Sequence, residues 1–109
     1  MSSVIKLVQN DNLPEVTLTL KDKRTDEPID LSDANTTVVV KFRARGTTTV
    51  LSVLQCSKVD AVNGVVRFGF PSNTLDVEQG NYEGEIEISF NGVIQSVFDL
   101  LYFYVREEF

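Results

Sequence analysis

The chain has 109 residues, of which 42% are hydrophobic and 24% are charged, and its formal net charge is −6. This length suits one domain with a proper core, so we expect a single domain over residues 1–109, and the negative charge opposes binding to nucleic acid. The longest mostly apolar stretch, Val97 to Val105, is far shorter than the roughly 20 residues that cross a bilayer, so we expect no membrane insertion.

The first part of the chain alternates short β-type runs with polar turns. Ser3 to Val8 predicts a first strand, and Glu15 to Asp22 predicts a second strand in which apolar residues alternate with Thr and Lys. This alternation is typical of a half-buried antiparallel strand. A polar turn then closes at Pro28, and we expect the isolated apolar residues Ile29 and Leu31 to pin the following connection over one end of the core.

The third predicted strand carries the one close group of basic residues in the sequence. It spans Thr36 to Arg45, and Lys41, Arg43 and Arg45 alternate along it, so these three side chains share one face. Two interpretations stay open for this face. It is either a solvated strand face or a site for an anion or an acidic partner.

The middle of the chain predicts two more strands. Thr47 to Cys56 is the fourth, and it ends on the single cysteine of the sequence, for which we expect a buried, inert thiol with a reactive thiol as the alternative. The dipeptide Asn63-Gly64 marks a turn, and Val65 to Phe70 follows it as the fifth strand.

The last part of the sequence predicts a C-terminal β-hairpin. Gly80 to Phe90 and Val93 to Val105 flank Asn91-Gly92, a dipeptide suited to a two-residue hairpin turn. Such a turn fixes the register of the two strands. The predicted pairs are Phe90 with Val93, Ile88 with Gln95, Ile86 with Val97 and Tyr82 with Leu101.

The final predicted strand is apolar on both faces, whereas a sandwich strand is expected to have one wet face. Three explanations stay open: a β-bulge that swaps the faces, cover by loops or by the N-terminal segment, and burial against another subunit. The third explanation predicts a protein interface. Its candidate residues are Phe98, Leu100, Tyr102 and Tyr104 on one face of this strand, together with Arg43 and Arg45.

Residue types that carry catalysis or bind metals are scarce in this sequence. Histidine is absent, which removes the usual general base, the commonest zinc ligand and every Ser-His-Asp arrangement. One cysteine cannot build a thiolate metal site, and there is no glycine-rich phosphate loop. We therefore expect no enzyme activity, no catalytic residues, no cofactor and no metal.

Two groups of carboxylates and one aromatic residue keep alternatives open. Glu83, Glu85 and Glu87 share a strand face, where paired carboxylates can hydrolyse glycosides, although solvated glutamates that prevent sheet aggregation explain them more simply. The acidic segment Asp26–Asp33 offers oxygen ligands for calcium, although Asp in turns more often bonds its own backbone. Tyr82 lies near carboxylates in the sequence, which suggests a glycan-binding module. Packing of this ring in the core or in an interface is the competing explanation.

Three ordered segments carry a family resemblance. They are Glu27-Pro28-Ile29-Asp30-Leu31-Ser32-Asp33-Ala34 with the following strand Val38–Arg43, Asp60–Phe68 with its Asn-Gly turn, and Gly80–Ile86 with its Gly-x-Tyr-x-x-Glu pattern. In this order they resemble the immunoglobulin-like N-terminal domain of phage baseplate upper proteins and related phage tail components. The resemblance covers residues from about 14 to 105.

The resemblance implies an antiparallel immunoglobulin-like β-sandwich of about seven to eight strands. In such a fold Gly80 and Tyr82 would start the penultimate strand, much as the tyrosine of a tyrosine corner does in other sandwiches. It implies a structural virion protein, made in the host cytoplasm, that assembles with other tail or head proteins and with copies of itself as a trimer or ring. Family members usually continue into long helices or a receptor-binding part, whereas this sequence ends at Phe109. That difference favours an adaptor role, with a capsid decoration protein and a glycan-binding receptor module as alternatives.

Overall fold

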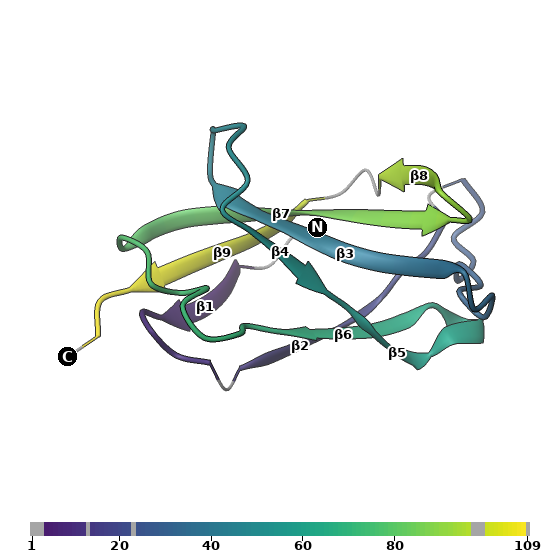
Figure 1. Cartoon of the computed structure of the whole chain (residues 1–109), viewed down its shortest axis with the longest axis horizontal. Helices are drawn as coiled ribbons and strands as arrows, with labels where there is room; N and C mark the ends of the chain where they lie inside the picture. Colours follow the sequence, from purple (N-terminus) through teal and green to yellow (C-terminus); the bar gives the residue numbers. More distant parts are fainter. Residues whose placement is uncertain (1–3, 13, 23, 97–99, 109) are drawn as a thin grey trace.

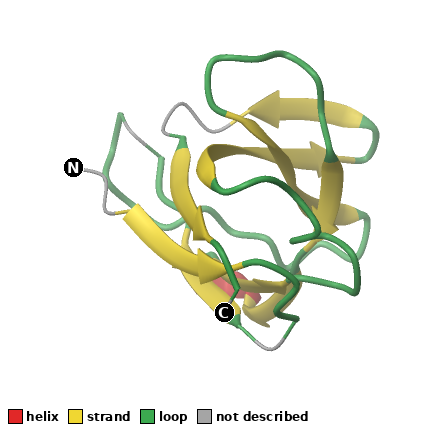
Figure 2. Ribbon diagram, turned by 90° about the vertical axis from the view of Figure 1, so that its left-hand side faces the viewer, coloured by secondary structure: helices red, strands yellow, loops and turns green. Residues whose placement is uncertain are grey.

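The computed structural model describes residues 4–12, 14–22, 24–96 and 100–108. These residues form nine β-strands and one short 3-10 turn, η1 (Ala61–Asn63), and the strands are arranged in two sheets (Figure 1). Figure 2 views the molecule end-on, with the strands in yellow, the connecting loops in green and η1 in red. The prediction of an all-β sandwich is confirmed.

The larger sheet contains six strands within the described part of the chain. In spatial order they are β1 (Val4–Val8), β9 (Leu101–Arg106), β7 (Gly80–Phe90), β3 (Thr36–Ala44) and β4 (Ser52–Gln55), and β8 (Val93–Ser96) pairs with the far end of β7. Neighbouring strands are antiparallel except β1 and β9, which are parallel. The first and last strands therefore lie side by side, which departs from the predicted purely antiparallel arrangement.

The smaller sheet consists of β2 (Glu15–Thr19), β6 (Val65–Gly69) and β5 (Ser57–Asp60), all antiparallel. Strands β4 and β5 follow each other directly and belong to different sheets, so the chain crosses from one sheet to the other at Cys56. The predicted end of the fourth strand is confirmed to within one residue, because β4 ends at Gln55, but β4 begins at Ser52 and not at Thr47. Strand β5 was not predicted, and strands that switch sheets in this way form the corners of a sandwich. The additional strand β5 and the division of the last strand into β8 and β9 raise the predicted strand number to nine in the described residues.

The core between the sheets is made by every second residue of the strands. On β3, Val38, Val40 and Phe42 are buried, as their alternation with polar residues predicts. Four phenylalanines meet at the centre with edge-to-face rings whose centroids lie 5.4 to 6.5 Å apart, an arrangement that aromatic rings prefer. They are Phe42, Phe68, Phe70 and Phe103.

The connection between β2 and β3 is pinned over one end of the core, as predicted. Leu31 is completely buried, and its backbone N–H donates to the carbonyl oxygen of Ala61 at 2.8 Å. Gly64 lies beside this connection with φ of 71°, and a Cβ there would lie 2.6 Å from the carbonyl oxygen of Leu20. Only glycine fits this close left-handed turn.

The hairpin turn at Asn91-Gly92 is confirmed, and so are its first register pairs. Phe90 faces Val93 and Ile88 faces Gln95, while Asn91 and Gly92 have φ of 52° and 87°. The predicted pair of Ile86 with Val97 lies outside the described residues.

The predicted pair of Tyr82 with Leu101 is wrong, because Tyr82 faces Phe103 and Gly84 faces Leu101. The register thus moves by two residues between β8 and β9. A two-residue shift keeps every side chain on its predicted face, since strand side chains alternate with period two. Gly84 explains the new register: it has no Cβ, and Phe103 packs into the space where one would lie.

Candidate functional site

The face of the larger sheet that points away from the core, called the outer face here, carries the candidate interface residues that the structure describes in β3 and β9. Tyr102 and Tyr104 alternate on β9 with the buried Phe103 and Val105. Arg43 alternates on β3 with buried apolar residues, as the sequence predicts. Strand β1 extends this face, because Val4 and Lys6 pair with Tyr102 and Tyr104.

Two basic residues of the outer face are engaged by glutamates of the neighbouring strand. Arg43 Nε donates to Glu83 Oε1 at 3.1 Å, and their side chains are only 22% and 10% exposed. Lys41 Nζ lies 2.6 Å from Glu87 Oε2, and this hydrogen bond raises the pKa of Lys41. The interpretation of these glutamates as solvated residues is therefore wrong, because β7 is a central strand and β3 supplies a cation beside it.

Arg45 behaves differently from Arg43. Its guanidinium carbon lies 5.2 Å from the centroid of the Tyr102 ring, a cation–π contact, and the residue is exposed. Its backbone N–H donates to the carbonyl oxygen of Asn81 at 3.1 Å, which continues the pairing of β3 with β7. The structure thus joins two of the predicted interface residues, Arg45 and Tyr102, in one contact.

The remaining interface candidates lie near this contact or outside the described residues. Tyr104 is 40% exposed and Leu100 is half-buried. Phe98 lies outside the described residues. Their role in binding a partner stays a prediction.

Two explanations for the apolar outer face of the last strand, a β-bulge and cover by the N-terminal segment, find no support in the described residues. Tyr102 and Tyr104 keep their predicted face, so no bulge swaps the faces within β9. The N-terminal segment forms β1 at the edge of β9, within the same sheet, and does not lie over the outer face. Cover by loops and burial against another subunit both stay open as predictions.

Two surface hollows follow the junction of β1 and β9. One has a volume of about 230 Å³ and is lined by Val4, Arg45, Asn81, Tyr82, Tyr102 and Phe103. The other has about 340 Å³ and is lined by Lys6, Leu7, Val8, Tyr104 and Arg106. Sequence reasoning missed the contribution of β1 and of Asn81. The sequence held one signal for Asn81. It comes two residues before Glu83, in the same alternation as Glu85 and Glu87, so it shares their face of the strand.

Tyr82, the residue proposed for glycan binding, belongs to the core. Its ring stacks on Phe42 with 5.1 Å between centroids and 10° between planes, and its hydroxyl donates to the carbonyl oxygen of Glu78 at 2.6 Å. Burial raises the pKa of this phenol. The hydroxyl thus bonds the backbone four residues upstream, as the hydroxyl of a tyrosine corner does, while the immunoglobulin-like character of the fold stays a prediction. A buried ring offers no stacking platform to a sugar.

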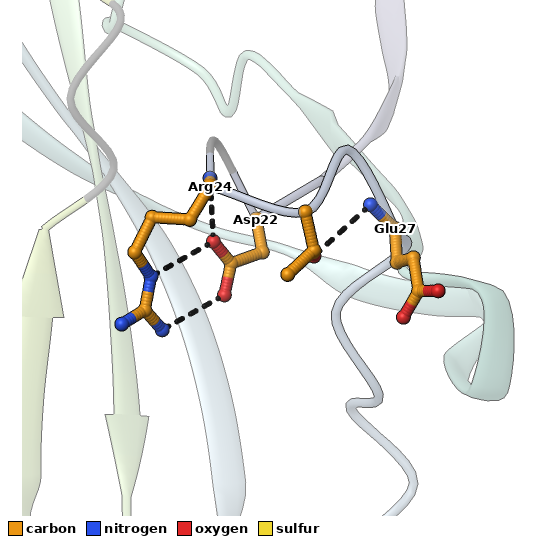
Figure 3. A network of polar contacts seen from close by, with 4 residues as sticks. Asp22, Arg24 and Glu27 are labelled. Atoms are coloured by element: carbon orange, nitrogen blue, oxygen red, sulfur yellow. Dashed lines mark hydrogen bonds and ion pairs between the residues drawn. The ribbon is translucent and has the colours of Figure 1, made fainter.

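The acidic segment that suggested calcium is organised by turn hydrogen bonds. The carboxylate of Asp30 accepts the backbone N–H of Ser32 at 2.9 Å, and that of Asp33 accepts the N–H of Asn35 at 2.8 Å. In the turn just before it, Asp22 accepts both the backbone N–H and the guanidinium of Arg24 (Figure 3). Within residues 4–12, 14–22, 24–96 and 100–108, no three Cys, Asp or Glu side chains gather to hold a metal ion.

Cys56 lies half-buried where the chain crosses between the sheets, and it packs against the core. Burial raises the pKa of its thiol to about 11. The thiolate is the reactive form, so at neutral pH this cysteine is inert, as the sequence analysis expects.

None of the described residues forms a helix long and apolar enough to span a membrane. No protein-family model and no curated protein matches the sequence. Among solved structures, the fold is similar to "N-terminal domain of phage TP901-1 ORF48", with a TM-score of 0.57 and 18% sequence identity. The match covers 97% of this chain and 85% of that chain, so the two share a fold along nearly the whole length.

Proposed function

We propose that the protein is a structural component of a phage virion, an assembly or adaptor module of the tail or baseplate with an immunoglobulin-like fold. It acts through contacts with other virion proteins and with copies of itself, as a trimer or ring, and it catalyses no reaction. The observation that carries this proposal is the pair Tyr102 and Tyr104 on the outer face, where Tyr102 is half-buried and Tyr104 is exposed among the described residues. Aromatic side chains are enriched in protein interfaces, which supports a contact surface here.

Two further observations support the proposal. The shared fold with a domain of a phage protein agrees with the ordered segments that resemble baseplate upper proteins. The ion pairs of Arg43 with Glu83 and of Lys41 with Glu87 hold the centre of the outer face in a fixed arrangement. A sheet that is held in this way and presents the exposed ring of Tyr104 suits a building block better than a catalyst, because a building block needs only a stable fold and a contact surface.

The assembly state of the purified protein tests the proposal. We expect light scattering to detect an oligomer, alone or after co-expression with the structural proteins of the same virion. Tyr104→Glu should dissociate this assembly and leave the fold intact, because that side chain is 40% exposed. Val62→Glu is the matched control, since Val62 is 62% exposed and lies in η1, between two strands of the smaller sheet.

A strict monomer at high concentration that binds none of those proteins would overturn the proposal. Equal effects of the two glutamate variants would also count against it, since they would show that the outer face has no special part in assembly. Antibody labelling of intact particles, imaged by electron microscopy, then locates the protein. Label at the tail tip supports the tail assignment, and label on the capsid replaces it with the decoration alternative.

A further inference from the structure

The row of charged pairs between β3 and β7 lacks its last acidic member. In the strand register, Lys41 faces Glu85 and Arg43 faces Glu83. The backbone hydrogen bond from Arg45 to Asn81 makes these two residues the next pair in the row. Asparagine therefore stands where the alternation of glutamates along β7 would place a fourth carboxylate. Arg45 has a neutral neighbour, unlike the other two cations.

Arg45 is consequently left without a carboxylate in the described residues. Its side-chain contact is with the face of the Tyr102 ring. A cation–π contact of this kind leaves N–H groups of the guanidinium free, and these groups match the two oxygens of a carboxylate. The ring therefore orients the guanidinium before any ligand arrives, which lowers the entropy lost on binding.

The surroundings of Arg45 fit a carboxylate that belongs to a larger partner. Asn81 and Tyr102 line the same hollow, and their amide and hydroxyl groups are further hydrogen-bond donors. Val4 adds an exposed apolar wall beside them. Lys6 lies on the neighbouring part of the outer face, paired in register with Tyr104. This is a locally basic and aromatic surface on a protein whose net charge is −6.

We propose that Arg45, Asn81 and Tyr102 bind a carboxylate side chain from an acidic segment of the partner protein. This inference rests on the proposed assembly function and specifies the chemistry of the partner. Charge complementarity favours an acidic segment, because Arg45 lines this hollow and, unlike Lys41 and Arg43, has no glutamate beside it in the described residues. A nucleic acid is disfavoured, since a polyphosphate needs several cations and meets a negatively charged protein.

The probe for this site is an amidated, acetylated hexaglutamate peptide, with hexaglutamine as its neutral counterpart. NMR of the arginine side chains of the whole chain reports binding at low salt. We expect a saturable shift of the Arg45 Nε–Hε signal with hexaglutamate and none with hexaglutamine. Arg45→Gln should weaken binding by roughly tenfold or more, the size expected for loss of a charge-assisted pair.

Asn81→Glu is the decisive variant, because it keeps Arg45 and supplies the missing acidic member of the row. The new glutamate should pair with Arg45 and weaken hexaglutamate binding about as much as the loss of the arginine. Arg67→Gln is the matched control for charge, since Arg67 is an exposed residue of β6 in the other sheet, and it should bind the peptide as the wild type does. Thermal unfolding checks that each variant is folded.

Undiminished hexaglutamate binding by Arg45→Gln or Asn81→Glu would overturn the proposed carboxylate site. Binding of decathymidylate in preference to hexaglutamate would also overturn it, in favour of a nucleic-acid surface. The two proposals fail separately. If hexaglutamate does not bind while Tyr104→Glu still dissociates the assembly, the carboxylate site falls and the assembly function stands. If hexaglutamate binds as expected and the protein never assembles, the assembly function falls.

Discussion

The hydroxyl of Tyr82 donates a 2.6 Å hydrogen bond to the backbone carbonyl oxygen of Glu78, while the Tyr82 ring stacks on Phe42 in the centre of the core. One side chain thereby joins the loop before β7 to the middle of β3. The contact fixes where β7 begins, and with it the strand that pairs β3 on one side and β9 on the other.

Removal of this hydroxyl should destabilise the fold. We expect Tyr82→Phe to lower the free energy of unfolding by about 1 kcal/mol, because the ring stays in place and one hydrogen bond is lost. Urea denaturation measures the change. Tyr104→Phe is the control: that side chain lies on the surface, so its variant should unfold as the wild type does. Equal stability of Tyr82→Phe and the wild type would show that the hydroxyl contributes nothing.

Gly84→Ala should destabilise the protein by about 1–3 kcal/mol through overpacking. A Cβ at this position would lie 2.8 Å from Val40 Cγ1 and 3.0 Å from Phe103 Cε2. Gly69→Ala is the matched control, since its nearest neighbour would lie 3.8 Å away. Calorimetry on both variants separates crowding at Gly84 from a general effect of replacing a strand glycine. A Gly84→Ala protein as stable as Gly69→Ala would contradict the packing of Phe103 over this position.

The ion pair of Arg43 with Glu83 should contribute more to stability than that of Arg24 with Asp22. The Arg43 and Glu83 side chains are 22% and 10% exposed, whereas those of Arg24 and Asp22 are 87% and 34% exposed. Solvent screens the charges of the second pair, and holding its two side chains in one geometry costs conformational entropy. Double-mutant cycles should give a coupling free energy of at least about 1 kcal/mol for Arg43 with Glu83. A larger coupling in the exposed pair would refute this ranking.

The thiol of Cys56 should make stability depend on alkaline pH. Its pKa is raised to about 11 by burial, so between roughly pH 9 and 11 the unfolded chain loses the thiol proton and the folded chain keeps it. Stability from this group is complete below that range and decreases as pH rises through it. Urea denaturation from pH 7 to 10.5 should show a steeper decline for the wild type than for Cys56→Ser. Parallel declines would contradict the burial of the thiol.

The limits of β3 and β7 were predictable because they depend on local alternation. The pattern in Thr36 to Arg45 and in Gly80 to Phe90 located β3 and β7 to within one residue of their ends. The crossing at Cys56 was not predictable in this way, since alternation does not reveal which sheet a residue joins. The register of β9 was missed for a related reason, because it depends on the space left by Gly84.

The sequence predicted which face of the sheet carries the candidate site residues, but it did not predict which side chains they contact. Alternation placed Arg43, Arg45, Tyr102 and Tyr104 on the outer side of the sheet. The engagement of Arg43 by Glu83, and the absence of such a glutamate beside Arg45, follow from the pairing of two strands that are far apart in the sequence. No local pattern contains that pairing.

The parallel arrangement of β1 and β9 has a mechanical consequence. The two strands point the same way in Figure 1, so the start of β1 and the end of β9 lie at opposite ends of the paired segment. A tensile force applied through residues 4 and 106 therefore acts along both strands in opposite directions. It strains the hydrogen bonds between them simultaneously in shear, whereas the antiparallel strands of a hairpin would open like a zipper, one bond after another. The first and last strands are thus paired in a geometry that such a force loads in shear.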